Sequence, residues 1–176
     1  MKKTLACALV AAGIMAGSSA ALAQSTATAT ATGTTTIIRP LTISKDVDLA
    51  FGRIVKPGTG SGTVAVANTG SSALAGSGAI ALPGLAVSHA QFTMAGEGGQ
   101  LVNVTVPASF DMALVGGTGQ KITVSLDPDL GTSTTLSNAL GVAGSKTLNV
   151  GGHFSLPSTQ DTGAYSGTFD VTVAYN

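Results

Sequence analysis

The sequence predicts an all-β fold, an antiparallel β-sandwich, on three observations. Apolar and polar side chains alternate wherever the chain has a regular pattern, as they do in a strand with one buried face. Glycine-rich stretches, at residues 58–62, 96–99 and 116–119, separate these segments and suit tight turns. The composition, with 24 glycines and only 9% charged residues, does not favour helical bundles.

The first 23 residues have the pattern of a secretory signal peptide. Lys2 and Lys3 precede the apolar stretch Leu5–Ala16, and Ala21-Leu-Ala23 supplies small residues at the expected cleavage point. The apolar stretch is too short to span a membrane, and it lacks the polar face that a helix buried against a domain would present. We therefore expect export through the inner membrane to the periplasm, the cell surface or the medium.

Residues 24–36 form a low-complexity arm in which threonine and alanine alternate. The alternation is compatible with an extended strand, but an alanine methyl group buries little apolar area. Alone, such a segment does not offset the ~1–2 kcal/mol per residue that ordering the backbone costs. The arm is expected to be either an unstructured tail or a strand that forms only against a waiting sheet edge.

Residues 37–176 are expected to form the sandwich domain. Alternation is clearest in residues 102–106, 122–126 and 169–175, each with one face for a core and one for water. Further candidate strands are Val47–Val55, Thr63–Ala67, Leu85–Met94, Phe110–Val115 and Lys146–Leu156. Helical spacing occurs only within residues 136–140, which is at most a couple of turns.

The sequence carries few signs of chemistry, so we expect no enzyme, no cofactor and no metal. Dinucleotide, phosphate-loop and nucleophile-elbow motifs are absent, and His89 and His153 have no second ligand at metal-binding spacing. Asp127 and Asp129 could approach a calcium ion, but an ordinary Asp-Pro turn explains them equally well. A formal net charge of zero argues against a nucleic-acid partner, and no later apolar run suggests a transmembrane span.

Three short motifs and the C-terminal alternation resemble a known family. The motif residues are Leu49, Phe51, Gly52, Gly151, Gly152, Gly163, Tyr165 and Gly167. Together they resemble an uncharacterised secreted bacterial family, domain of unknown function 4402, over roughly residues 37–176. More distantly, the Phe-Gly element and the C-terminal strand resemble spore-coat-U-like and chaperone–usher pilin domains.

The pilin resemblance implies an immunoglobulin-like sandwich that a strand from a neighbouring chain completes. It implies that the arm is the donor strand, with Thr26, Ala27, Ala29, Ala31 and Thr36. It further implies that a periplasmic chaperone grips an edge lined by Phe169, Val171, Val173 and Tyr175. Alternatively, the chain's own Ile37–Ile43 segment closes the sheet, with Pro40 at an edge or bend, and the same residues are ordinary core.

Two functions of different classes follow. The first is a structural subunit of a cell-surface fibre or extracellular matrix that self-assembles by strand addition. The second is a monomeric secreted binding module, for example for carbohydrate, on the same sandwich. Aromatic residues make up only 4% of the chain, and this scarcity disfavours sugar stacking and favours the structural subunit.

Overall fold

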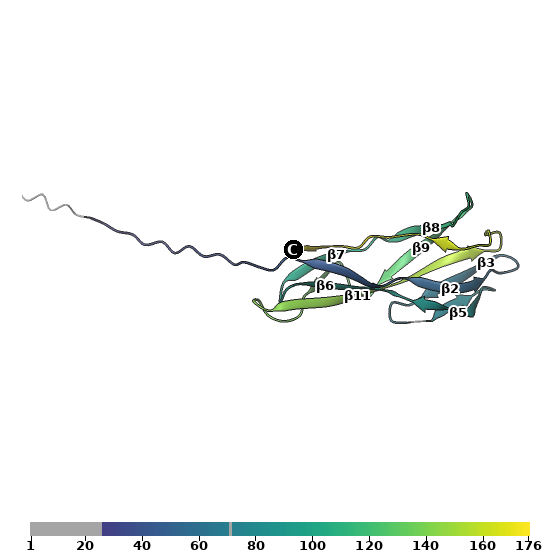
Figure 1. The fold of residues 1–176 in the computed structure, drawn as a ribbon, viewed down its shortest axis with the longest axis horizontal. Coiled ribbons are helices and arrows are strands. Elements are labelled where there is room, and N and C mark those ends of the chain that lie inside the picture. The colour runs from purple at the N-terminus through teal and green to yellow at the C-terminus, as the bar shows by residue number, and fades with distance from the viewer. Residues whose placement is uncertain (1–25, 71) are drawn as a thin grey trace, which may run out of the picture. The chain divides into compact units, whose positions relative to one another are not determined.

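A computed structural model describes residues 26–70 and 72–176. The expected signal peptide therefore lies outside the described residues. From Thr36 to Asn176 the chain forms one compact unit, and its described residues form strands, turns and loops but no helix (Figure 1). The predicted all-β class is confirmed.

The strands follow one another with short turns, as the glycine-rich punctuation indicates. In chain order they are β1 Thr42–Val47, β2 Ala50–Val55, β3 Ser61–Val66, β4 Ala73–Gly76, β5 Ile80–Ser88, β6 Ala90–Glu97, β7 Leu101–Thr105, β8 Ser109–Leu114, β9 Lys121–Pro128, β10 Ser133–Thr135, β11 Ala143–Pro157, β12 Tyr165–Ser166 and β13 Thr172–Tyr175. The sequence pattern did not indicate β4 or β10, which are short and contain few large apolar residues.

All strand pairings are antiparallel, as predicted. The largest sheet has the order β1-β6-β11-β9-β8-β12, and β3 and β4 extend from β11. Two smaller sheets have the orders β10-β7-β13 and β2-β5. In Figure 1, β6 and β7 extend toward the end that carries the C-terminus, whereas β2, β3 and β5 lie toward the opposite end.

The long strand β11 connects these two ends. Its first half pairs with β6, and its second half, from Gly152, pairs with β3 along the same edge. Gly151 and Gly152 mark the change of partner. A Cβ atom at Gly151 would collide with the carbonyl oxygen of Val66, and one at Gly152 would lie 3.1 Å from the carbonyl oxygen of Ser125. Only residues without side chains fit where three strands approach so closely.

The core is built by the alternation that the sequence displays. Val102 and Val104 of β7 and Ile122, Val124 and Leu126 of β9 are all buried, which confirms the two clearest alternating segments. The largest fully buried side chains are Met94, Leu136, Leu148, Val64, Val66, Val102, Val124 and Val150. They come from strands β3, β6, β7, β9 and β11 and, with Leu136, from the segment after β10, so one continuous core holds the sheets together.

Two candidate strands were predicted too long. The segment Val47–Val55 is interrupted after β1, and Leu85–Met94 is interrupted at His89, between β5 and β6. β1 and β6 pair in the large sheet, whereas β2 and β5 pair in a separate two-stranded sheet. The chain therefore changes sheets twice, between β1 and β2 and again between β5 and β6. The Ser88 hydroxyl donates to the carbonyl oxygen of Asp48 between these two points. A period of two in the sequence does not reveal a change of partner.

Three further expectations need correction. The strand predicted at residues 169–175 is shorter: only Thr172–Tyr175 form a strand, β13, because the chain leaves β8 after β12 and joins β7 only at Thr172. Of the segment Ile37–Ile43, only the last two residues belong to a strand. Residues 136–140 form no helix, because the backbone N–H of Leu136 donates to the carbonyl of Gln100 and draws the leucine into the core.

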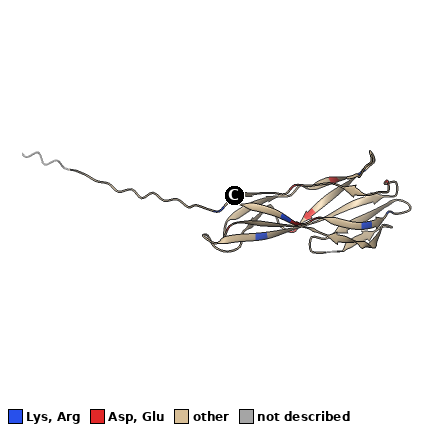
Figure 2. Cartoon of the chain, viewed as in Figure 1, with Lys and Arg blue, Asp and Glu red and all other residues tan. Residues whose placement is uncertain are grey.

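Charged residues are sparse and scattered along the strands and loops of the domain, as the coloured segments in Figure 2 show. Within the part of the chain that the structure describes, no helix has the length and apolarity needed to cross a bilayer.

Candidate functional site

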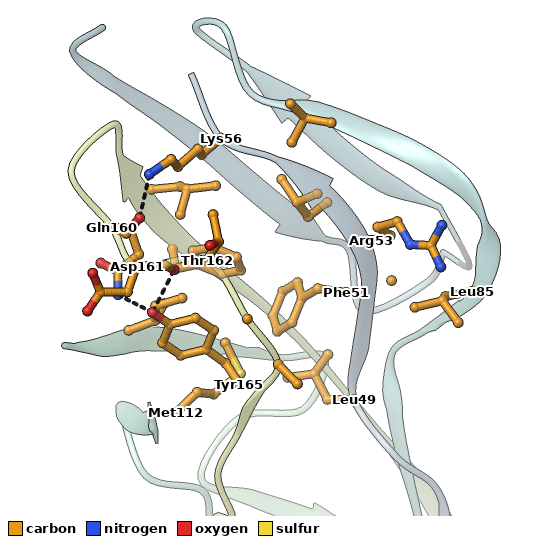
Figure 3. A pocket seen from close by; sticks show the side chains of 18 residues that line it. Leu49, Phe51, Arg53, Lys56, Leu85, Met112, Gln160, Asp161, Thr162 and Tyr165 are labelled. Atoms are coloured by element: carbon orange, nitrogen blue, oxygen red, sulfur yellow. Dashed lines mark hydrogen bonds between the residues drawn. The ribbon is translucent and has the colours of Figure 1, made fainter. Parts of the chain in front are cut away.

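An apolar groove of about 670 Å³ lies between β2 and the segment that leads from Gln160 to Tyr165 (Figure 3). Its lining residues are Leu49, Phe51, Gly52, Arg53, Ile54, Val55, Lys56, Leu85, Met112, Ile122, Phe154, Leu156, Gln160, Asp161, Thr162, Gly163, Ala164 and Tyr165. Most of these side chains are apolar, and they come from six strands and three connecting segments. We refer to this feature as the groove.

The floor of the groove is part of the hydrophobic core. Phe51 of β2 packs edge-to-face on Phe154 of β11, with ring centroids 5.0 Å apart. Both rings are buried, as are Ile122 and Leu156 beside them, and Met112 is half-buried. An apolar segment that entered the groove would therefore contact rigid, well-packed side chains.

A bulge in β2 shapes one wall. The pairing register of β2 with β5 shifts between Phe51 and Arg53, and Gly52 between them has φ +72°. A Cβ atom at Gly52 would lie 2.8 Å from the Val87 side chain, so both the positive φ and the close packing require glycine. The bulge turns Phe51 toward the core while Arg53 remains exposed.

Hydrogen bonds fix the opposite wall. The Lys56 ammonium donates to the carbonyl oxygen of Gln160 over 2.7 Å, which links β2 to the loop. The Gln160 amide donates to the Tyr165 hydroxyl (2.9 Å), and that hydroxyl donates to the carbonyl of Asp161 (2.9 Å), as Figure 3 shows. Gln160 is buried, and this network satisfies its side chain. The wall is thus held in place without closing the groove.

The backbone edges that face the groove have no strand partner in the described residues. β2 pairs only with β5 through its other edge, and β12 pairs only with β8. The carbonyl of Ala164 accepts a hydrogen bond from Val115, again on the β8 side. The groove therefore combines an apolar floor with two strand edges on which backbone groups are open to a further strand.

The family-motif residues gather around this groove. Leu49, Phe51, Gly52, Gly163 and Tyr165 line it directly. Gly152 lies beneath, where its missing side chain leaves room for Leu49, 3.2 Å from the ideal Cβ position. Gly151 and Gly167 make close backbone approaches elsewhere, to β3 and to β8. Sequence reasoning identified these residues as a motif but did not bring them together in one place.

The residues predicted to line an assembly edge lie differently. Phe169, Val171, Val173 and Tyr175 are half-buried, pack against the core and do not line the groove. Phe169 contacts the Phe92 and Phe110 rings. β13 pairs with β7 on one side and has no strand partner on the other among the described residues. At this edge the open groups are backbone groups, and the predicted side chains face inward.

The predicted donor arm carries no regular secondary structure in its described part, residues 26–36, and its side chains are exposed. Thr26, Ala27, Ala29, Ala31 and Thr36 therefore all remain accessible. Its role as a donor stays a prediction.

The sequence analysis missed a polar cluster around Glu97, the only glutamate, at the end of β6. The Glu97 carboxylate is buried and accepts hydrogen bonds from the Arg39 guanidinium (3.1 Å) and from the backbone N–H groups of Arg39 and Gly141. The Tyr175 hydroxyl accepts from the Glu97 N–H (2.7 Å) and donates to the Arg39 carbonyl (2.9 Å). We refer to these four residues as the Glu97 cluster.

The Glu97 cluster keeps its carboxylate ionised. The backbone hydrogen bond from Gly141 is the main cause that lowers the pKa of Glu97 below its ordinary value of 4.5, and Arg39 adds to it against the opposing effect of burial. The sequence signal that could have found it is a single glutamate followed by two glycines in a chain with few charges.

The histidines and the two aspartates at the end of β9 have protein partners, and Asp127 and Pro128 pair with β11 in place of the expected Asp-Pro turn. His153 is exposed, and its ring nitrogen lies 2.7 Å from an Asp127 oxygen. Asp129 accepts from the backbone N–H and the side-chain amide of Asn149. Among the described residues, no group of three or more His, Cys, Asp or Glu side chains is placed to hold a metal ion.

Fold and groove together define a class: an all-β antiparallel sandwich with an apolar groove between unpaired strand edges. A family model described as a domain of unknown function (DUF4402) matches residues 41–175. The chain belongs to this family, which confirms the membership that its motifs indicated. No match was found among curated proteins or among solved structures.

Proposed function

We propose that the chain is a non-enzymatic exported structural protein, a pilin-like subunit of a cell-surface fibre or matrix that assembles by β-strand addition. The observation that carries the proposal is the groove, with its apolar floor between two strand edges. On such edges the backbone N–H and C=O groups pair with an added strand, and alternate side chains of that strand fill the floor.

The dimensions of the groove suit a short extended segment. β2 has six residues and is about 20 Å long, so it can pair with roughly six residues of an added strand. About three side chains of that strand would then face the floor, because successive residues point to opposite faces. The rim is held by Lys56, Gln160 and Tyr165 before any strand arrives, so little ordering is needed on binding.

The proposal includes export and a periplasmic chaperone. Export rests on the signal-peptide pattern of residues 1–23. Open edges beside an apolar groove favour aggregation, and natural proteins cover such edges. A chaperone that covers the groove and the outer edge of β13 before assembly would serve this purpose.

A monomeric binding module is the second candidate, and the volume of the groove favours it. About 670 Å³ lies within the range of small-molecule sites, and the Phe51 and Tyr165 rings could contact an apolar or sugar ligand. This function requires no strand from another chain.

The test compares the exported full-length protein with two kinds of variant by light scattering after size exclusion. Deletion of residues 26–36 removes the arm, and Ala164→Arg places a charge in the groove from an exposed position. Ala113→Arg is the matched control, because Ala113 is exposed on the neighbouring strand β8 but does not line the groove.

We expect concentration-dependent polymers that both the deletion and Ala164→Arg abolish and that Ala113→Arg leaves intact. An exported wild-type protein that stays monomeric at every concentration tested would contradict the proposal. Such a monomer, binding a small ligand that Ala164→Arg displaces, would establish the binding module instead.

A further inference from the structure

An exposed isoleucine stands where the arm joins the domain. The Ile37 side chain is 88% exposed, the largest exposed fraction among the large apolar side chains of the described residues. Ile38 follows it and is 40% exposed. Other large apolar side chains are also exposed, but less so: Leu74 is 67% and Val115 61% exposed.

The arm has two different faces when it is extended. One face carries Ile37 together with Thr35, Gly33 and the alanines at positions 27, 29 and 31. The other face carries Ile38 and a row of threonines at even positions. The first face is small and apolar up to its single large side chain, and no charge occurs between residues 26 and 38. This face matches an apolar groove, and the threonine face suits water.

The root of the arm is tied to the Glu97 cluster. Arg39 donates to the Glu97 carboxylate from its guanidinium and its backbone, and to the Gly141 carbonyl over 3.2 Å. Its own carbonyl accepts from the Tyr175 hydroxyl. With both side chain and backbone held, the position of Arg39 on the domain is fixed.

Ile37 is therefore too far from the groove of its own chain. It lies two residue steps from Arg39, which allows a reach of about 7 Å. β1 runs along β6 from Thr42, opposite Ala95, to Val47, opposite Gln91, and the groove begins only beyond it. These five residue steps alone cover about 17 Å.

We propose that Ile37 enters the groove of a second copy of this chain and is the apolar anchor of the donated strand. The inference rests on the proposed function and names its partner and its anchor. When the Ile37 side chain faces the floor of the groove, Thr35 and Gly33 are the next residues on the same face of the donated strand. The alanines that precede them continue this face along the strand edge. Gly33 and the alanines allow the two backbones to approach closely.

The geometry also fixes the mode of assembly. The donor anchor lies at the Glu97 end of one subunit, and the acceptor groove lies at the opposite end of the next. Such an interface joins two different surfaces, so repeated addition produces an open chain of subunits. Because only Pro40 and Leu41 separate the tied Arg39 from β1, the joint between neighbouring subunits is short.

The first experiment measures assembly of the exported protein by sedimentation velocity. Ile37→Ser is expected to weaken subunit association about 10- to 100-fold, because the interface loses the burial of one large aliphatic side chain. Ile38→Ser is the matched control, since it removes the same side chain from the other face and should assemble like the wild type. Both positions are exposed, so neither variant depends on refolding of the core.

The second experiment identifies whose groove is filled. Cys7 is the only cysteine, so in a Cys7→Ala background Ile37→Cys and Ala164→Cys are combined in one chain and oxidised with oxidised glutathione. A ladder of disulfide-linked dimers and longer species on a non-reducing gel supports the proposal. Ile38→Cys with Ala164→Cys, which places the thiol on the opposite face, should give a much weaker ladder.

Three results separate the two proposals. A monomer with an internal disulfide would overturn the inference by showing that Ile37 reaches its own groove. Unchanged assembly of Ile37→Ser, while Ala164→Arg still abolishes it, would overturn the inference and leave the proposed function standing. A wild-type protein that never assembles would overturn both.

Discussion

The two ends of the sandwich differ in the hydrogen-bond partners of their backbone and polar groups. At the Glu97 end, Arg39 and Gly141 donate to one buried carboxylate, and the Tyr175 hydroxyl accepts from the Glu97 N–H. At the groove end, β2 and β12 leave edges without strand partners over an apolar floor. At one end polar contacts surround a buried carboxylate, and at the other an apolar floor lies beside two unpaired strand edges.

The two ends also differ in where their few charged residues lie. Only 9% of residues are charged, yet the single glutamate is buried at the closed end. The groove end has Lys56, Arg53 and Asp161 among its lining residues, and its floor is apolar. A closed end can hold the root of a donor segment, and an open end can accept one, so the comparison is the basis of the head-to-tail assembly proposed above.

The largest effect on stability is expected at the floor of the groove. Phe154→Ala should lower the free energy of unfolding by about 3–5 kcal/mol, because it removes the ring that packs on Phe51 and leaves a cavity. Urea unfolding measures the change. Leu74→Ala, at an exposed leucine, should cost under about 1 kcal/mol. A similar small loss at Phe154 would show that the floor is not part of the core.

The two tyrosines compare the ends directly. Tyr175→Phe should cost about 1–2 kcal/mol, because it leaves the N–H of Glu97 and the carbonyl of Arg39 without a partner. Tyr165→Phe should cost less, about 0.5–1 kcal/mol, because water entering the open groove can replace its hydroxyl. Thermal or urea unfolding measures both losses of stability. A larger loss for Tyr165→Phe than for Tyr175→Phe would contradict the contrast between the two ends.

The pH dependence of stability depends on the Glu97 cluster. Since folding lowers the pKa of Glu97, its contribution is fully present above the ordinary value of 4.5 and is lost as the pH falls through the lowered value. Glu97→Gln should therefore be less stable than the wild type at neutral pH, and its stability should decline less on acidification. Urea unfolding at a series of pH values below 5 measures this, and parallel curves for the two proteins would contradict it.

An effect as small as that of Tyr165→Phe is expected at Lys56, on the rim of the groove. Lys56→Met removes the hydrogen bond to the Gln160 carbonyl and should cost about 0.5–1 kcal/mol. The change should appear more clearly as faster amide hydrogen exchange in residues 160–165 than as a change in global stability. Unchanged exchange there would show that the lysine does not hold this wall.

Local patterns predicted much of the fold. The alternation in residues 102–106 and 122–126 placed the correct side chains in the core, because each strand buries one face whatever its partner. The changes of sheet at Asp48 and His89 were not predicted, because they depend on which strand lies alongside. The Glu97 cluster was missed for the same reason: its partners lie 58 and 44 residues away along the chain.

The sequence by itself determined the class of the fold, the family and the set of motif residues, since side-chain periodicity and glycine placement are properties of neighbouring residues. Only the tertiary structure decided that Leu49, Phe51, Gly163 and Tyr165 meet in one groove and that Arg39 is tied to Glu97. Both arrangements join segments more than fifty residues apart, and which distant segments meet is set by the packing of the whole core.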